Sequence, residues 1–183
     1  MGRWASPELI STARSGDASA AARLIEMIWP KCFSLATAVI GDWNLAQDAT
    51  QEACIIVHHR IGTLRHTQAF DAWLYRILIR ECARVRRRKT ATVQSIYAHV
   101  FGSDVTATMD VWRALANLPP PLRDVAVLFY LDDLTSREIS NILRTPHATV
   151  RTRLGRARDR LRTILGNYAN ETPTGYEVNQ HAF

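Results

Sequence analysis

The chain has 183 residues, of which 47% are hydrophobic, so it can form one ordinary domain or two small ones with packed cores. Its formal net charge of +6 favours a polyanionic partner. Three scattered cysteines are too few for a disulfide framework, and neither a signal peptide nor an apolar run of membrane-spanning length is visible. We therefore expect a cytoplasmic protein without membrane insertion.

The first half of the chain predicts a bundle of helices. Residues 1–16 are small and polar and are expected to form a loose lead-in, after which Asp17 is a candidate N-cap. Apolar residues then recur at helical spacing. Pro30 is expected to kink or restart the first helix, and Gly41 and Gly62 are expected to end helices. Because no segment alternates for long enough to indicate a strand, residues 17–89 are predicted to form an all-α domain.

The last helix of this domain is predicted from Asp71 to about Arg88 and carries an arginine stripe opposite its apolar face. The stripe, with Trp73 at its head, comprises Arg76, Arg80, Arg84 and Arg87. Like charges at this spacing repel one another, which favours an anionic ligand. An aromatic ring next to a basic track is typical of single-stranded nucleic-acid binding. A core position for Trp73 and a merely solvated stripe are the alternatives.

Residues 90–109 lack a sustained period and are predicted to be a flexible linker between two domains. The second domain is predicted to span 110–166, with its first helix over 110–117 ended by Pro119–Pro121 and its next over 122–131. Residues 167–183 are polar and are expected to be disordered.

The stretch from Thr135 to Arg162 predicts a helix-turn-helix. Thr135 and Glu138 form a capping-box pattern, and Thr145 with Pro146 is expected to cap and begin a second helix. The second helix has one apolar face, and its remaining surface is rich in arginine, with Asp159 as the only acid. A short helix, a tight turn and a longer basic helix suit the major groove of DNA. The alternative is a solvated amphipathic helix.

These motifs, spanning about 17–165, resemble the bacterial sigma factors of the extracytoplasmic-function (ECF) type. The segments LPPPLRDVAVLFYLDDLTSREISNIL and TVRTRLGRARDRLR resemble the family's second domain. GDWNLAQDATQEA resembles the segment that binds the clamp coiled coil of core RNA polymerase, and FDAWLYRI the segment that leads into the −10 helix. The resemblance implies two small helical domains joined by a flexible linker, the second a four-helix domain with the helix-turn-helix.

The resemblance also implies a function. Such factors are not enzymes; they bind core RNA polymerase and direct it to promoters, and an anti-sigma factor usually restrains them. By family position, the polymerase-binding residues would be Asp48, Gln51 and Glu52. The duplex −35 element would be read by Arg151, Thr152 and Arg156, with phosphate contacts from Arg153, Thr135 and Ser136.

The opened, single-stranded −10 element would be held by a base-binding loop and by the arginine stripe. Its expected contacts are Arg65, His66, Phe70, Trp73, Arg76, Arg80, Arg84 and Arg87. Arg80 and Arg84 depart from the family, which commonly has an asparagine and an acidic residue at these positions. Cys54 and His58 stand at family core positions that are usually Phe and Trp, and Ala148 replaces a frequent glycine.

Other functions are less favoured by the sequence. A stand-alone helix-turn-helix repressor or activator would have no use for the first domain, and an enzyme acting on nucleic acid would need an acid–base or metal cluster that we do not find. Cys54 and His58 share a helix face, but no further ligand pair completes a site. We therefore expect neither a cofactor nor a metal.

Overall fold

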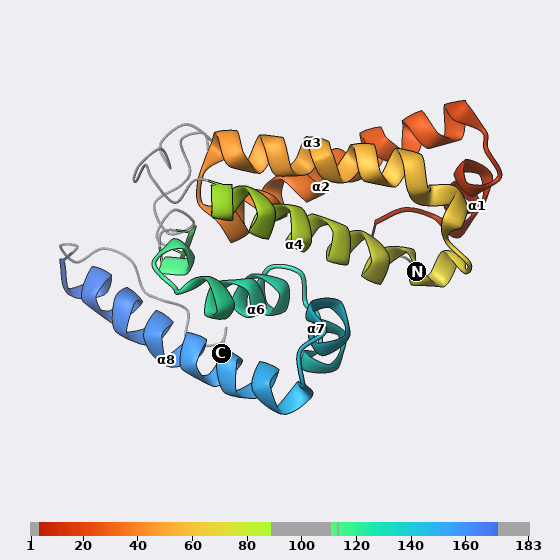
Figure 1. The fold of residues 1–183 in the computed structure, drawn as a ribbon. Coiled ribbons are helices and arrows are strands. Elements are labelled where there is room, and N and C mark those ends of the chain that lie inside the picture. The colour runs from red at the N-terminus through yellow and green to blue at the C-terminus, as the bar shows by residue number, and fades with distance from the viewer. Residues whose placement is uncertain (1–3, 89–110, 113, 172–183) are drawn as a thin grey trace.

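The computed structural model describes residues 4–88, 111–112 and 114–171 of the chain, with side chains as far as residue 166 (Figure 1). Regular secondary structure within these ranges is entirely helical, without a strand, which confirms the all-α prediction. The predicted linker at 90–109 lies outside the described residues.

Three long helices form the body of the first domain: α2 (Ala18–Ile40), α3 (Trp43–Arg60) and α4 (Phe70–Arg88). The Asp17 carboxylate accepts a hydrogen bond from the Ala20 N–H at 2.7 Å, so the predicted N-cap is confirmed. Gly41 ends α2 with a φ of 76°, a left-handed conformation that favours glycine. Helix α2 runs through Pro30 without a break, so the helix does not restart there. Ile28 and Cys32 on either side are fully buried, and this packing outweighs one lost backbone hydrogen bond.

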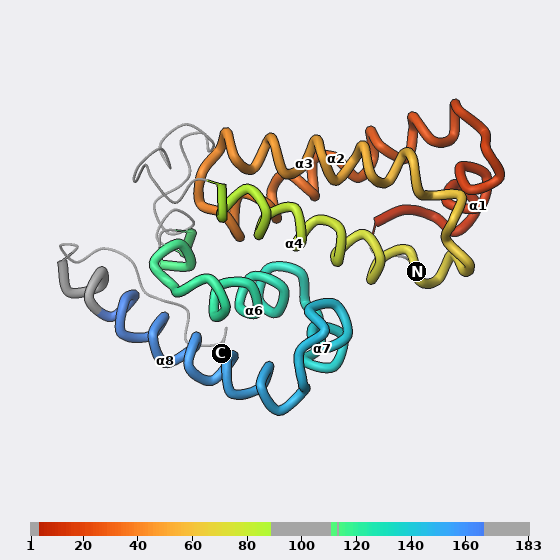
Figure 2. The backbone as a smooth tube through the Cα atoms, viewed as in Figure 1, coloured from red at the N-terminus to blue at the C-terminus, as the bar shows by residue number. Residues whose placement is uncertain are grey.

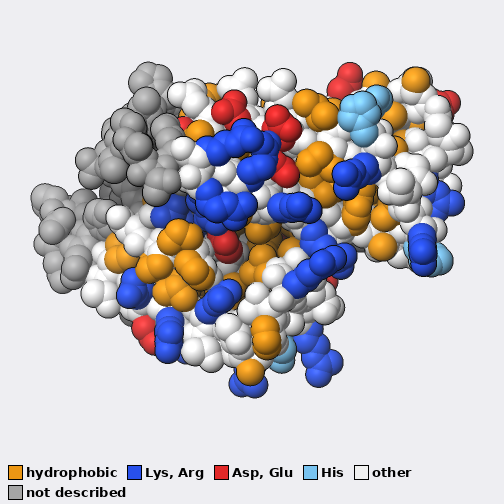
Figure 3. Space-filling model, in the orientation of Figure 1, with side chains coloured by type: hydrophobic (Ala, Val, Ile, Leu, Met, Phe, Trp, Pro, Cys, Tyr) orange, Lys and Arg blue, Asp and Glu red, His pale blue; other side chains and the backbone are white. Residues whose placement is uncertain are grey.

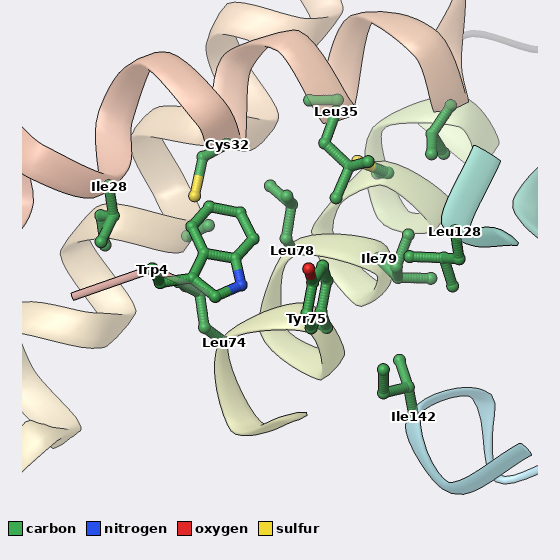
Figure 4. Packing of buried hydrophobic residues seen from close by; sticks show 14 of the residues in the cluster. Trp4, Ile28, Cys32, Leu35, Leu74, Tyr75, Leu78, Ile79, Leu128 and Ile142 are labelled. Carbon is green, nitrogen blue, oxygen red and sulfur yellow. The ribbon is translucent and has the colours of Figure 1, made fainter. Parts of the chain in front are cut away.

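The prediction of a loose lead-in is wrong for the described part of the N-terminal segment, residues 4–16, and residues 1–3 lie outside the described residues. Residues Pro7–Arg14 form α1, whose Leu9 N–H is capped by the Ser6 hydroxyl at 3.3 Å. Trp4 is only 5% exposed and lies edge to face with Tyr75 of α4, with ring centroids 5.1 Å apart (Figure 4). The ammonium group of Lys31 lies 4.6 Å from the Trp4 ring centroid. Trp4, together with the buried side chains of Ile10 and Ala13, therefore anchors this segment on the domain.

The second domain contains helical residues at 111–112 and 114–116, followed by α6 (Pro120–Tyr130), α7 (Ser136–Leu143) and α8 (His147–Glu171). Helix α8 continues beyond Gly166, so the predicted disorder is wrong for 167–171, and 172–183 lie outside the described residues. Pro146 precedes α8 rather than occupying its first turn, and its carbonyl accepts the Val150 N–H at 3.1 Å.

The two domains pack against each other over one continuous apolar core. Helix α7 lies against α4 and α6 lies against α2, so the second domain covers one side of the first (Figures 1 and 2). Figure 4 shows Ile79 of α4 facing Leu128 of α6, with Ile142 of α7 nearby. All three side chains are buried, so the interface is apolar at its centre.

Charged contacts at the edge of this interface join the domains. We call them the interdomain clamp, and its residues are Lys31, Arg86, Arg123, Asp124 and Asp132. Arg86 of α4 donates two hydrogen bonds to Asp124 of α6, at 2.9 and 3.2 Å. Arg123 donates to the carbonyls of Val39 and Ile40 at 3.3 and 3.1 Å, which satisfies the C-terminal end of α2. Lys31 pairs with Asp132 at 2.6 Å.

Three free cysteines, Cys32, Cys54 and Cys82, are buried in the first domain. Burial raises the pKa of the Cys54 thiol to about 11 and raises the pKa values of the other two thiols still further. These side chains therefore behave as small apolar core residues. None of the described helices combines the length and apolar character needed to cross a bilayer.

Candidate nucleic-acid interface

The start of α7 has the geometry that the sequence predicts. The Thr135 hydroxyl accepts the Glu138 N–H at 3.3 Å, and the Glu138 carboxylate accepts the Thr135 N–H at 2.7 Å, so the capping box is confirmed. Ser136 Oγ lies 2.8 Å from Nε2 of His147, the first residue of α8. This contact ties the starts of the two helices together across the motif.

The turn between α7 and α8 is held by short-range hydrogen bonds. The Ser140 hydroxyl donates to the Thr145 carbonyl at 2.8 Å, and the Thr145 N–H donates back to the Ser140 carbonyl at 3.1 Å. The Thr145 hydroxyl instead donates to the Leu143 carbonyl at 3.3 Å, so Thr145 does not cap α8 as predicted. Arg144 adopts a left-handed conformation with a φ of 49°, which glycine usually occupies. Together these contacts fix the angle at which α8 leaves the turn.

Helix α8 presents the three predicted base-reading residues to solvent. Arg151, Thr152 and Arg156 are exposed, while Val150 and Ala157 are fully buried against the rest of the domain. The Thr152 hydroxyl donates to the Ala148 carbonyl at 3.0 Å, so its oxygen remains available as a hydrogen-bond acceptor.

Arg153 is placed differently from these three residues. It is half-buried and lines a hollow of about 600 Å³ between α8 and the start of α6. The hollow is also lined by Pro119, Pro121, Leu122, Arg156, Asp159 and Arg160. Arg153 and Arg160 make this hollow basic, next to the exposed face of α8.

The predicted −10 loop, residues 65–70, follows the short helix η1 (Ile61–Thr63) and contains a second one, η2 (Thr67–Ala69). Arg65 and His66 are exposed on it. Arg14 of α1 donates to the carbonyls of Leu64 and Arg65, at 3.4 and 3.0 Å, so the N-terminal helix holds the loop in place. Sequence reasoning missed Arg14, because no local pattern links it to a loop 50 residues later.

Phe70 does not belong to this surface, which corrects the prediction that it contacts a base. Its side chain is 0% exposed. It precedes Leu74 and Leu78 at steps of four, so it lies on the core face of α4. Trp73 packs against the core and is half-buried, with its ring centroid 6.0 Å from that of Phe70. Trp73 is therefore neither a fully buried core residue nor a fully exposed one.

The arginine stripe divides into two parts. Arg76, Arg80 and Arg87 are exposed on α4. Arg84 is half-buried and forms ion pairs with Glu81 and, at 3.4 Å, with Glu52 of α3. The hydrogen bond that Arg84 donates to the Glu81 carboxylate raises the pKa of Arg84 above its ordinary value. The prediction of an uninterrupted, unpaired ladder is therefore wrong at Arg84.

The predicted polymerase-binding residues lie together on α3. Asp48, Gln51 and Glu52 are exposed, and they border a groove of about 380 Å³ between α3 and α4. Its other lining residues are Leu45, Arg84, Val85 and Arg88. Basic side chains cover much of the face shown in Figure 3, and acidic ones lie among them over α3. The structure thus places Arg84 with the α3 residues that the sequence assigns to a different surface.

Cys54 and His58 lie in different environments on α3. Cys54 is buried, whereas His58 is exposed beside His59, so the expectation of a core position for His58 is wrong. Among the described residues, no group of three His, Cys, Asp or Glu side chains is placed to hold a metal ion.

Comparisons with known proteins match both halves of the chain. The family model for sigma-70 region 2 matches residues 24–92, and the model for sigma-70 region 4 matches residues 108–161. The ECF RNA polymerase sigma factor SigM of Mycobacterium tuberculosis is 30% identical over 178 residues, which cover 94% of this chain and 89% of SigM. The chain belongs to the ECF sigma factors.

Other relatives of this ECF sigma factor are similar over most of both chains. SigW of Bacillus subtilis, also an ECF RNA polymerase sigma factor, is 29% identical over 85% of this chain and 94% of SigW. Two solved structures share the fold, each with a TM-score of 0.67. CnrH, solved with the cytosolic domain of CnrY, is 21% identical over 88% of this chain and 97% of its own. Bartonella quintana RpoE, solved with the anti-sigma factor NepR, is 20% identical over 75% and 91%.

Proposed function

We propose that this ECF sigma factor binds core RNA polymerase through α3 and directs it to promoters by reading two DNA elements with its two domains. One observation carries the proposal: the matches to sigma-70 regions 2 and 4 are joined on one chain, and each falls on a domain with its own exposed polar surface. A stand-alone repressor would need only the helix-turn-helix, and it has no support in the comparisons.

The −35 element is read as duplex by α8. Arg151 and Arg156 are exposed and can each donate two hydrogen bonds to guanine O6 and N7. Thr152 uses its proton within the helix, so its oxygen suits a base-edge donor such as the cytosine or adenine amino group. Arg153 and the start of α7, at Thr135 and Ser136, contact phosphates and set the orientation of the motif.

The −10 element is held as single strand by the first domain. Arg65 and His66 lie on the loop that Arg14 supports, and Arg76, Arg80 and Arg87 present cations along α4. Exposed arginines at this spacing repel one another, and phosphates relieve that cost. Trp73 offers a partly exposed ring for stacking next to these arginines.

Core polymerase binds at Asp48, Gln51 and Glu52, whose side chains share one face of α3. An anti-sigma factor is a further partner, since Bartonella RpoE was solved with one.

The test is in vitro transcription by core polymerase on a promoter library, with and without this protein. Specific transcripts that depend on the protein are expected. The variant Asp48→Ala/Gln51→Ala should lose core binding in a pull-down while its helicity, measured by circular dichroism, stays unchanged. Unchanged core affinity for this variant, with transcription independent of the protein, would contradict the proposal.

A further inference from the structure

Arg84 of the arginine stripe forms two ion pairs, one with Glu81 on its own helix and one with Glu52 of α3. Glu81, one turn earlier on α4, is buried, and a buried carboxylate requires a charged partner or neutralisation. Arg84 supplies that partner through its Nε, which holds the guanidinium in place. Its terminal NH2 group then lies 3.4 Å from the carboxylate of Glu52, whose side chain is 48% exposed.

Local charge argues against a DNA contact at this position. Arg84 and Arg88 contribute two positive charges to this groove. Asp48, Glu52 and Glu81 contribute three negative ones, so the cluster carries a net charge of about −1 when all five groups are ionised. A phosphate that approached Arg84 would meet an excess of negative charge. Arg80, one turn earlier on the same helix, is exposed and lies nearer the −10 loop along α4.

The groove between α3 and α4 has a lining that suits a particular kind of partner. Asp48 and Glu52 lie four residues apart on one face of α3, and Arg84 borders the same groove. Leu45 and Val85 add apolar lining. Arg88 is the second guanidinium of the lining. With Glu81 counted, the carboxylates still outnumber the guanidiniums, so the groove suits a partner helix that carries a cationic side chain between apolar ones.

We propose that Arg84 is a positioning residue for polymerase binding: it holds the Glu52 carboxylate at the edge of the groove and does not contact the −10 strand. This inference rests on the proposed function of α3. It also accounts for the replacement of a commonly acidic residue by arginine, because an acid at position 84 would repel both Glu52 and Glu81.

The experiment compares Arg84→Met, Glu52→Gln and the double variant, with Arg80→Met as the matched control on the same helix. Affinity for core polymerase is measured by biolayer interferometry, and affinity for an oligo(dT) single strand by fluorescence anisotropy at low salt. Arg84→Met and Glu52→Gln should each weaken the affinity for core polymerase on the order of five-fold. The double variant should bind no more weakly than the single variant with the lower affinity. Oligo(dT) affinity should fall for Arg80→Met but not for Arg84→Met.

Independent, additive losses of core affinity would overturn the inference, as would unchanged core affinity with weakened oligo(dT) binding for Arg84→Met. Because Arg84→Met leaves Glu81 buried without its cation, Glu81→Gln/Arg84→Met is tested beside it and should show the same loss of core affinity. If Glu52→Gln and Asp48→Ala/Gln51→Ala all left core affinity unchanged, the proposed function of α3 would fail, which is distinguishable from a failure at Arg84 alone.

Discussion

Substitution of Arg86 tests whether the two domains are held together in solution as the structure has them. Arg86→Met removes two hydrogen bonds to Asp124 and one to the Val39 carbonyl, at 3.2 Å. Truncating one partner of a fully buried ion pair costs about 3–5 kcal/mol, since the other charge stays buried without its partner.

The loss of stability expected for Arg86→Met is smaller than this range for fully buried pairs. The side chains of Arg86 and Asp124 are 19% and 16% exposed, so water screens part of the interaction. Arg123 still donates to the Val39 carbonyl in the variant, so this acceptor keeps a partner. We therefore expect a loss of about 2 kcal/mol in the free energy of unfolding, below the range for fully buried pairs.

The assay is urea unfolding followed by circular dichroism, with Arg23→Met, an exposed change on α2, as control. The double variant Arg86→Met/Asp124→Leu replaces the pair with apolar side chains and should recover most of the lost stability. If Arg86→Met shifted the unfolding free energy by no more than Arg23→Met, within about 0.5 kcal/mol, the domains would not make this contact in solution and the reasoning would be refuted.

Three further predictions follow from named contacts. Arg151→Ala should cost about 1–3 kcal/mol of promoter binding and relax the preference for particular base pairs. Arg153→Ala should weaken binding to all DNA sequences about equally and flatten the salt dependence of binding. Anisotropy titrations on a −35 duplex library at several salt concentrations measure both effects. Arg144→Gly should stabilise the protein by up to about 1 kcal/mol in urea unfolding, because glycine adopts the left-handed conformation without strain. Burial raises the pKa of Cys54 to about 11 in the folded protein. The protonated thiol therefore contributes its full stabilisation below pH about 9, and this contribution is lost as the pH rises towards 11. Because Cys54→Ala lacks the thiol, its free energy of unfolding should decrease less over that interval than that of the unsubstituted protein.

The sequence predicts those parts of the fold that depend on short-range signals. The capping box at Thr135 and Glu138, the N-cap at Asp17 and the helix end at Gly41 all involve residues within one turn of each other. The burial of Phe70 could also have been found, because it continues the spacing of Leu74 and is therefore a core position.

The features that sequence reasoning missed depend on pairs far apart in the chain. The pairing of Arg84 with Glu52, the support of the −10 loop by Arg14 and the contact between Arg86 and Asp124 each join separate helices or a helix and a loop. Helical periodicity places a side chain on a face but does not say which element covers that face. Arg86 does lie on the same face of α4 as Tyr75 and Ile79, so the spacing alone marks it as separate from the stripe.

The packing of the second domain on the first has a consequence for any binding partner that needs the domains apart. Because both domains belong to one chain, their association is intramolecular, with an effective concentration on the order of millimolar. An interface with a dissociation constant of about 1 μM between separated domains would then be closed about a thousand-fold more often than open. A ligand that binds only the open arrangement would lose that same factor in apparent affinity, about 4 kcal/mol, so each weakened contact in the interdomain clamp would appear as tighter binding of that ligand.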